Sequence, residues 1–230
     1  MNAYSAFLFD FDFTLVNALP GIVKSYNTAF QTYGLPAMDD LTVKKTVGLP
    51  VPTSFMLMNP KVDESLAIEL DKVFTKAADR YMGPNTSFLP GVRDFLLALQ
   101  EKGCALGVVT TKKGYRIHDF FRQEGLSDLL SLVIGGDEVA NMKPHPEGIL
   151  TACDFLLHRH GIPKEKVLYV GDSLVDAEAA ARAGIDFAAV LTGTTEKEEF
   201  SAFPSRLIEP TMSDLRRRLF PVASESECSR

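Results

Sequence analysis

The sequence predicts an α/β fold, a doubly wound and mostly parallel sheet with an inserted α-helical domain. Three observations predict it. Short and almost continuously apolar segments alternate with helical patterns along most of the 230 residues, as expected of buried parallel strands with covering helices. Polar residues directly follow several of these segments. A block of about seventy residues near the start of the chain carries helical patterns and no convincing strand.

The expected strands share a short length and an apolar composition. They are residues 4–9, 105–109, 131–135, 167–171 and 187–191. The segments between the strands show helical spacing of apolar residues, and each ends in a glycine, which is a common helix stop. They are residues 91–103, 114–125, 145–161 and 174–184. Because such strands are apolar along their whole length, we expect helices to cover both faces of the sheet.

The helical block interrupts the alternation early in the chain. We expect residues 17–86 to form the inserted domain, and residues 1–16 and 87–230 to form the α/β core, with proline and glycine clustered near the second boundary. Helices are expected within the block, and Lys44 and Lys45 are expected on a solvated helix face. The expected helices are residues 17–34 and 63–83. The polar end of the chain, residues 223–230, is expected to be disordered.

The charge balance excludes two broad classes of partner. Lys and Arg number 24 against 30 Asp and Glu, a formal net charge of −6, so nothing favours binding to a nucleic acid or an anionic membrane. A small anionic substrate remains compatible if a metal or a few basic groups neutralise it locally. No apolar stretch approaches the length of a membrane span.

The cysteines indicate a reducing compartment. Cys104, Cys153 and Cys228 are odd in number and widely spaced, so we expect reduced thiols and a cytoplasmic protein. The first apolar run has no basic segment before it and is interrupted by Asp10, so no secretory leader is expected. The sequence leaves the oligomeric state open between monomer and homodimer.

The stretch "AFLFDFDFTLV" places Asp10 and Asp12 at the end of the first expected strand. Side chains two residues apart in an extended segment point the same way, and the carboxyl ends of parallel strands form the ligand-binding edge of such a sheet. Other expected strands deliver polar groups to this edge. They are Thr110, Thr111, Asp172 and, four residues later on an expected helical face, Asp176.

Several carboxylates at one point repel one another unless a cation lies among them. Because the expected ligands are oxygens without His or Cys, Mg²⁺ fits best. Lys143 could add a positive charge. Taken alone, each of these residues also has an ordinary structural role, such as a helix cap or a solvated surface lysine. Together, those roles would require all of them to meet at one edge by accident.

Four segments, in this order, carry a resemblance: "DFDFTLV" (10–16), "VVTTKK" (108–113), "KPHPEGIL" (143–150) and "VGDSLVDAEAA" (170–180). They resemble the signature motifs of the haloacid dehalogenase-like hydrolase superfamily, most closely its phosphoglycolate phosphatase-like branch. The resemblance implies a Rossmann-like core, with the inserted helical domain as a cap over the active site. The dehalogenases of the superfamily lack the second aspartate, so Asp12 favours phosphate chemistry.

The resemblance also implies roles for the residues at the sheet edge. Asp10 would be the nucleophile, and Asp12 would protonate the leaving oxygen and then activate water. Asp10, the backbone carbonyl of Asp12 and Asp172 would hold Mg²⁺, with Asp176 supporting them indirectly. The residues expected at the phosphate are Phe11, Asp12, Thr110, Thr111 and Lys143, and Lys143 would also act in catalysis. In the cap, Gly48 and Leu49 are weaker candidates for residues near the substrate.

The chain departs from the family pattern at a few positions. Phe13 stands where glycine is usual, and Asn17, Ala18 and Thr111 replace other common residues. The expected activity is Mg²⁺-dependent hydrolysis of a small phosphorylated metabolite, such as phosphoglycolate, a sugar phosphate, a nucleotide or pyrophosphate. Two alternatives are a β-phosphoglucomutase-like phosphomutase and, less favoured, a non-catalytic module in which phosphorylated Asp10 serves as a signal.

Overall fold

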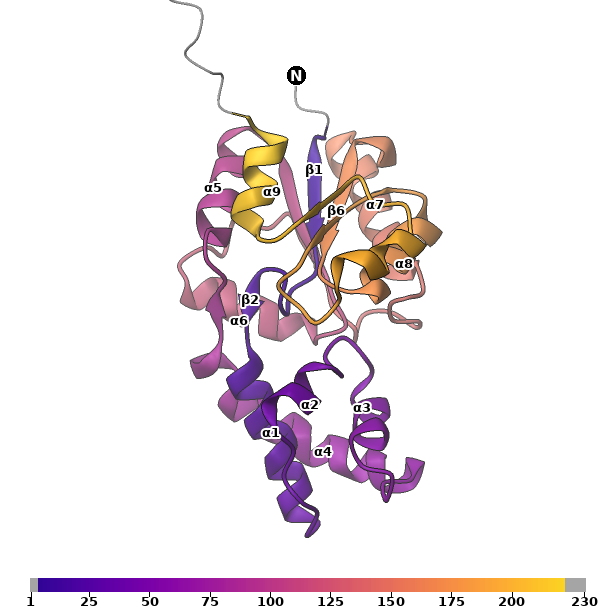
Figure 1. Cartoon of the computed structure of the whole chain (residues 1–230). Helices are drawn as coiled ribbons and strands as arrows, with labels where there is room; N and C mark the ends of the chain where they lie inside the picture. Colours follow the sequence, from indigo (N-terminus) through magenta and orange to yellow (C-terminus); the bar gives the residue numbers. More distant parts are fainter. Residues whose placement is uncertain (1–3, 222–230) are drawn as a thin grey trace, which may run out of the picture.

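The structure is a computed structural model that describes residues 4–221. It confirms the predicted fold class, since a parallel sheet with flanking helices occupies one end of the molecule and a group of helices the other (Figure 1). The expected disordered tail, residues 223–230, lies outside the described residues, as does Cys228.

The main sheet has six parallel strands in the order β5-β4-β1-β6-β7-β8. The strands are β1 (Ala6–Phe9), β4 (Ala105–Val109), β5 (Leu132–Ile134), β6 (Val167–Gly171), β7 (Asp186–Val190) and β8 (Leu207–Glu209). The first strand of the chain is central, because Ala6 of β1 is in register with Ala105 of β4 on one side and Val167 of β6 on the other. Five of these strands were expected. The edge strand β8 was not, because its three half-buried residues end in the charged Glu209 and form no apolar run.

Alternating side chains of β1 build two separate hydrophobic clusters. Phe7 and Phe9 belong to one cluster, and Ala6 and Leu8 belong to the other. Two groups of helices, on opposite sides of the sheet (Figure 1), pack against it and contribute to these clusters. They are α5 (Val92–Glu101), α6 (Gly114–Gln123) and α9 (Met212–Leu219) for the first, and α7 (Glu147–His160) and α8 (Leu174–Ala183) for the second. The fold is therefore wound in both directions from β1, as predicted.

The helical end of the molecule has its own aromatic centre. The ring of Tyr26 in the first helix lies 4.4 Å from that of Phe74 and 4.9 Å from that of Phe55. The helices are α1 (Leu19–Thr32), α2 (Asp40–Lys44), α3 (Val51–Met58) and α4 (Glu64–Tyr81). Short 3₁₀ turns complete the described helical segments. They are Gly83–Asn85, Lys164–Lys166 and Lys197–Ala202. We refer to α1–α4 as the helical unit.

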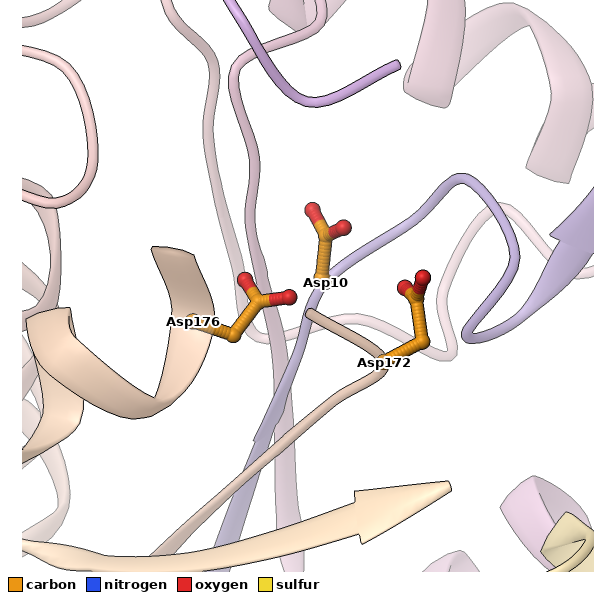
Figure 2. A group of neighbouring side chains, drawn as sticks. All are labelled: Asp10, Asp172 and Asp176. Atoms are coloured by element: carbon orange, nitrogen blue, oxygen red, sulfur yellow. The ribbon is translucent and has the colours of Figure 1, made fainter. Parts of the chain in front are cut away.

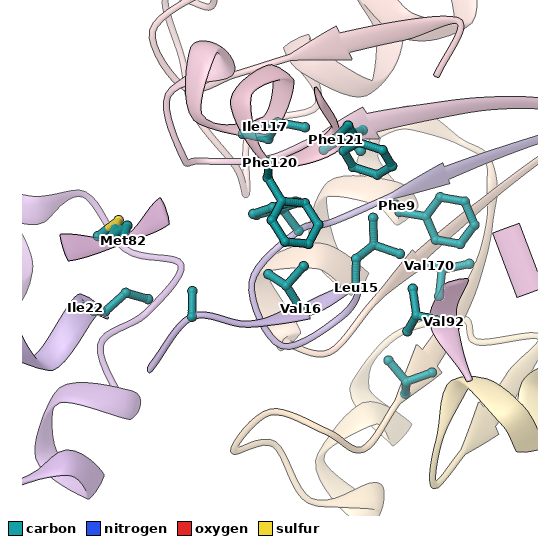
Figure 3. Close-up of a cluster of buried hydrophobic side chains, with 14 of the residues drawn as sticks. Phe9, Leu15, Val16, Ile22, Met82, Val92, Ile117, Phe120, Phe121 and Val170 are labelled. Carbon is teal, nitrogen blue, oxygen red and sulfur yellow. The ribbon is translucent and has the colours of Figure 1, made fainter. Parts of the chain in front are cut away.

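Two chain segments connect the helical unit to the sheet, and they pair with each other. The strands β2 (Val16–Asn17) and β3 (Ser87–Phe88) form an antiparallel ribbon. Buried side chains continue across this connection, from Ile22 and Met82 of the helical side to Phe120 below the sheet (Figure 3). The ribbon lies at the expected boundary between inserted domain and core, although the limits 17–86 stay a prediction.

The close approach of α1 to the end of α4 depends on a glycine. A Cβ atom on Gly21 would lie 2.8 Å from Met82 Cα and 2.9 Å from the Tyr81 carbonyl oxygen. Gly21→Ala should therefore lower the free energy of unfolding by ~1–3 kcal/mol, because backbone atoms cannot move away as a side chain can. Gly83→Ala is the matched control, since its nearest neighbours are side-chain atoms of Gln123 at 3.7 Å and beyond. Urea unfolding that ranks the two variants equally would contradict this view of the contact.

Candidate active site

The predicted polar residues meet at the carboxyl edge of three adjacent strands. Asp10 directly follows β1, and its backbone N–H donates to the carbonyl of Val170 in β6 at 2.9 Å. Thr110 follows β4 and is buried. Asp172 follows β6 and is also buried. The register of the central strands therefore places residues that are far apart in the sequence at one edge.

Three buried carboxylates form the centre of the site (Figure 2). Oxygen atoms of Asp10, Asp172 and Asp176 all lie within 4.8 Å of one another. Asp172 and Asp176 were expected to lie on one face of a helix, and the structure differs on this point. Asp172 lies before the helix, because α8 begins at Leu174 and Ser173 is its N-cap. The two side chains meet because the strand β6 and the first turn of α8 point into the same space.

Lys143 is buried between two of these acids. Its Nζ lies 2.8 Å from Oδ1 of Asp10 and 2.5 Å from Oδ1 of Asp176. The hydroxyl of Tyr169 accepts a hydrogen bond from the same Nζ at 2.8 Å. Asp10 Oδ1 is fully buried. Although it lies 2.8 Å from Lys143 Nζ, the two atoms do not have the geometry of a hydrogen bond. This oxygen is therefore held close to a positive charge without a hydrogen bond that meets the usual geometry.

Asp176 differs from the other two acids because its oxygens are fully engaged. Its Oδ1 accepts from Tyr169 at 3.0 Å as well as from Lys143. Its Oδ2 accepts from the backbone N–H of Ser173 at 3.1 Å and from the Ser173 hydroxyl at 2.6 Å. These contacts orient Lys143 and close the first turn of α8. They support the predicted indirect role of Asp176 rather than direct coordination of a cation.

Asp12 lies outside the three-acid group and has its own cation. Lys112 Nζ donates to both oxygens of Asp12, at 2.8 Å and 3.0 Å, and both side chains are largely buried. The sequence analysis did not assign Lys112 a role. Its signal was its place in "VVTTKK", directly after the expected phosphate-binding residues Thr110 and Thr111. Since the Asp12 carboxylate is engaged by Lys112, only its backbone carbonyl remains for the predicted metal contact.

The loop after Asp12 supports Asp172. The hydroxyl of Thr14 donates to Asp172 Oδ1 at 2.8 Å, a contact that the sequence analysis missed. Phe13 has a φ of 59°, in the left-handed region where glycine is favoured, which gives a physical reason for glycine being usual there. Phe11 points its ring into the hydrophobic core against Phe120, with centroids 5.5 Å apart, so only its backbone could serve a phosphate.

Burial and mutual repulsion perturb the acids. Burial raises the pKa of Asp10 to about 6, with Asp176 adding to the rise and Lys143 opposing it. Burial also raises the pKa of Asp172 well above its usual range, helped by the charges of Asp176 and Asp10. For Lys143, burial lowers the pKa, but the carboxylates of Asp10 and Asp176 outweigh it and raise the pKa overall.

The charges at this edge do not balance. Among residues 4–221, the ion pairs of the four carboxylates, of Asp10, Asp12, Asp172 and Asp176, involve two ammonium groups, those of Lys112 and Lys143. One divalent cation would neutralise the remainder. The oxygen-only donors and the buried Asp10 oxygen without a hydrogen bond fit a hard cation such as Mg²⁺. The residues present therefore form a group that could hold a metal ion.

A cavity of about 190 Å³ separates this edge from the helical unit. Asp12, Thr111 and Lys112 line it from the sheet. The predicted cap residues Gly48 and Leu49 line the opposite wall. Their predicted nearness to a substrate is compatible with this position but stays a prediction. Of the four acids of the site, Asp12 lies in the lining of this cavity, while Asp10, Asp172 and Asp176 do not.

A profile of haloacid dehalogenase-like hydrolases matches residues 7–190 of this chain, which includes all of the site. The chain belongs to this hydrolase family. A phosphoglycolate phosphatase of Escherichia coli (strain K12) is 30% identical, with 96% of this chain and 95% of the relative covered. The corresponding enzyme of E. coli O157:H7 is also 30% identical over the same shares.

Solved structures agree with this assignment. A haloacid dehalogenase-like hydrolase from Bacteroides fragilis is 35% identical and superposes with a TM-score of 0.85, over 92% of this chain and 99% of the other. A predicted phosphoglycolate phosphatase from Haemophilus somnus gives a TM-score of 0.80 at 25% identity, over 96% and 100%. The chain is accordingly a phosphatase of the haloacid dehalogenase-like family, and the phosphomutase alternative is not favoured. Within residues 4–221, no helix has both the length and the apolar character needed to cross a membrane.

Replacing one acid of this hydrolase should show how much the repulsion among the buried carboxylates lowers the stability of the fold. In metal-free buffer at neutral pH, Asp172→Asn should raise the thermal unfolding midpoint, because it removes a buried charge and can still accept the Thr14 hydrogen bond. A carboxyl group whose pKa is raised by folding stabilises the fold below its unfolded pKa and loses that contribution as pH rises. The advantage of the variant should therefore shrink toward about pH 4.

The same variant should respond poorly to metal. Millimolar Mg²⁺ should stabilise the wild-type protein, and it should stabilise Asp172→Asn much less. Asp128→Asn, which changes an exposed aspartate outside the group, controls for the general loss of charge. A metal-free Asp172→Asn protein less stable than the wild type at neutral pH would show that repulsion does not dominate the site.

Proposed function

We propose that this phosphatase hydrolyses small phosphate monoesters through a phosphorylated Asp10, with Mg²⁺ bound by Asp10, Asp172 and the carbonyl of Asp12. The observation that carries the proposal is the buried Asp10 carboxylate, which lies beside Lys143 and has an oxygen without a hydrogen bond. The cation would offset the charge of the acids and of the phosphate. The identity to phosphoglycolate phosphatases makes phosphoglycolate the first substrate to test.

In the first step, a carboxylate oxygen of Asp10 attacks phosphorus and the bond from phosphorus to the ester oxygen breaks. Asp12 gives its proton to the departing oxygen, so that an alcohol leaves. Thr110, the backbone at Thr111 and Lys143 are proposed to hold the phosphoryl oxygens while charge develops. Lys143 is already fixed for this task by Asp176 and Tyr169.

In the second step, Asp12 takes a proton from water, and the hydroxide attacks phosphorus. The bond to Asp10 then breaks, which releases inorganic phosphate and restores the carboxylate. Lys112 holds Asp12 in an ion pair, and this contact has to loosen before Asp12 can reach the departing oxygen. Lys112 also lines the cavity, so an incoming phosphate would compete with Asp12 for the Lys112 ammonium group.

The lining of the cavity is compatible with an organic leaving group. Ile22, Tyr26 and Phe74 of the helical unit supply apolar side chains, and Lys112, Lys113 and Arg116 add positive charge that would suit an anionic substrate. Enclosure between the two parts of the molecule favours a small metabolite over a phosphoprotein. A panel of phosphorylated metabolites, measured by phosphate release with Mg²⁺ and with EDTA, tests the proposal and ranks the substrates. A cytoplasmic location and a monomeric or homodimeric state stay predictions.

Asp10→Asn should reduce phosphate release at least ~10³-fold, because an amide oxygen is a poor nucleophile and no other carboxylate occupies its place. The near-isosteric change should leave the circular dichroism spectrum unchanged. Asp128→Asn, with its exposed side chain, should keep wild-type activity. Substantial turnover by Asp10→Asn would exclude Asp10 as the nucleophile.

Asp12→Asn should be slowed in a way that depends on the leaving group. We expect losses of about 10²–10⁴-fold with alkyl phosphates, whose oxygens need a proton, and smaller losses in the first step with p-nitrophenyl phosphate. Burst measurements with both esters separate this step from hydrolysis of the phosphoryl-enzyme. Equal first-step losses for both esters would show that Asp12 is not the general acid.

The remaining alternative is a module that accepts a phosphoryl group on Asp10 as a signal. Such a module would bind metal and take up a phosphoryl group without turnover. Incubation with a chromogenic phosphate ester and Mg²⁺ separates the two, since continued release of phosphate identifies an enzyme and a single stoichiometric release identifies the module.

A further inference from the structure

Lys44 of the helical unit crosses to the sheet and contacts the loop that follows β7. Its Nζ donates to the carbonyl of Gly193 at 3.0 Å and lies 3.4 Å from that of Thr192. The same Nζ lies 4.9 Å from the ring centroid of Phe13. The expectation of a solvated helix face is therefore wrong for Lys44, which is half-buried, while Lys45 is exposed as expected.

Both loops that Lys44 contacts enclose Asp172. Gly193 packs directly on this acid, because a Cβ atom on Gly193 would collide with Asp172 Oδ2. On the other side, Thr14 donates to Asp172 Oδ1 at 2.8 Å, and Thr14 follows Phe13 in the first loop. The Thr192 hydroxyl donates to the Phe13 carbonyl and so joins the two loops. Asp172 is thus held between two loops that meet under the Lys44 ammonium group.

We propose that Lys44 is a positioning residue that couples closure of the helical unit to the placement of Asp172. When the helical unit is closed, the ammonium group holds the Gly193 carbonyl and the Phe13 ring together, and the loop presses on Asp172. When the helical unit moves away, this restraint is lost and Asp172 gains freedom. The ligand that Asp172 offers to a cation is therefore best placed in the closed molecule.

Phe13 gives this arrangement a physical basis. Its left-handed backbone is unfavourable for a residue with a side chain, and the ring must therefore gain from its surroundings. The ring is buried and faces the Lys44 ammonium group, an arrangement that attracts a cation. A glycine at this position would remove the strain of the left-handed backbone, but it would also remove the aromatic ring that the Lys44 ammonium group contacts.

Within residues 4–221, a second polar link also joins the helical unit to the α/β part of the molecule. On α6, Tyr115 and Arg116 both bond to Asp79 of α4, with Arg116 Nη2 2.7 Å from Asp79 Oδ1. This second link joins two helices, and its hydrogen bonds run from Tyr115 and Arg116 to Asp79 and the Thr75 carbonyl, away from the loops around Asp172. Only the Lys44 link, of these two, reaches residues that touch the acid group.

The test compares Lys44→Met with Lys45→Met, which removes a charge from the adjacent exposed position. Mg²⁺ binding is measured by calorimetry in the absence of substrate, and amide exchange of peptides spanning residues 188–196 is measured in the metal-free protein. We expect Lys44→Met to weaken Mg²⁺ binding about tenfold, the effect of losing one charge-assisted hydrogen bond, and to speed exchange of the loop. Lys45→Met should match the wild type in both.

Kinetics and a conservative variant separate positioning from substrate contact. If Lys44 positions Asp172, Lys44→Met should lower kcat for p-nitrophenyl phosphate with little change in KM, and Lys44→Arg should recover part of the Mg²⁺ affinity. Mg²⁺ affinity and loop exchange within twofold of the wild type in Lys44→Met would overturn the proposal. A raised KM with unchanged Mg²⁺ binding would also overturn it, because Lys44 would then be a substrate contact.

This inference rests on the proposed function only for its kinetic arm. A wild-type protein that hydrolyses no ester would refute the proposed function and leave the binding and exchange results to decide the role of Lys44. Phe13→Leu provides a second variant, since it removes the aromatic face while keeping an apolar side chain. It should weaken Mg²⁺ binding in the same direction as Lys44→Met, and an unchanged affinity would count against the proposed coupling.

Discussion

The main physical constraint on this structure is the repulsion among the carboxylates that lie at one edge of the sheet. Folding places Asp10, Asp172 and Asp176 within 4.8 Å of one another in a buried space, which is unfavourable until positive charge enters it. Lys143 supplies part of that charge and is held between Asp10 and Asp176. The residual negative charge is what would attract the proposed cation and, with the cation, a phosphate group to this edge. The catalytic arrangement and the local cost to stability have the same origin.

The parallel sheet is able to bear this cost because the strands themselves are anchored elsewhere. Phe7 and Phe9 of β1 pack on one side of the sheet while Leu8 packs on the other, so the strand that ends in Asp10 is fixed by apolar contacts on both faces. The acids lie only beyond the ends of the strands, where the hydrogen-bonded ladder stops. The apolar residues within the strands therefore stabilise the fold, while the acids beyond the strand ends form the site. Repulsion among these acids does not disturb the core.

Much of this arrangement follows from the sequence, and the parts that do not have physical reasons. Five strands and the convergence of Asp10, Thr110 and Asp172 follow from apolar runs that end in polar residues. The edge strand β8 was not predicted because its three half-buried residues end in the charged Glu209 and form no apolar run, whereas α9 does carry a helical signal, with Met212, Leu215 and Leu219 on one face. The partners of the acids, Lys112 and Thr14, were missed because pairing between side chains depends on where loops turn in space, which local pattern does not encode.

The antiparallel ribbon of β2 and β3 has a consequence for how the two parts of the molecule can separate. Val16 faces Phe88 and Asn17 faces Ser87, so the outgoing and returning chains are bonded side by side. A sideways slide of the helices over the sheet would shear these bonds, whereas bending the ribbon as a unit leaves them intact. If the helical unit and the sheet separate, this pairing favours rotation about the β2–β3 ribbon. The cavity would then widen on the side away from the ribbon.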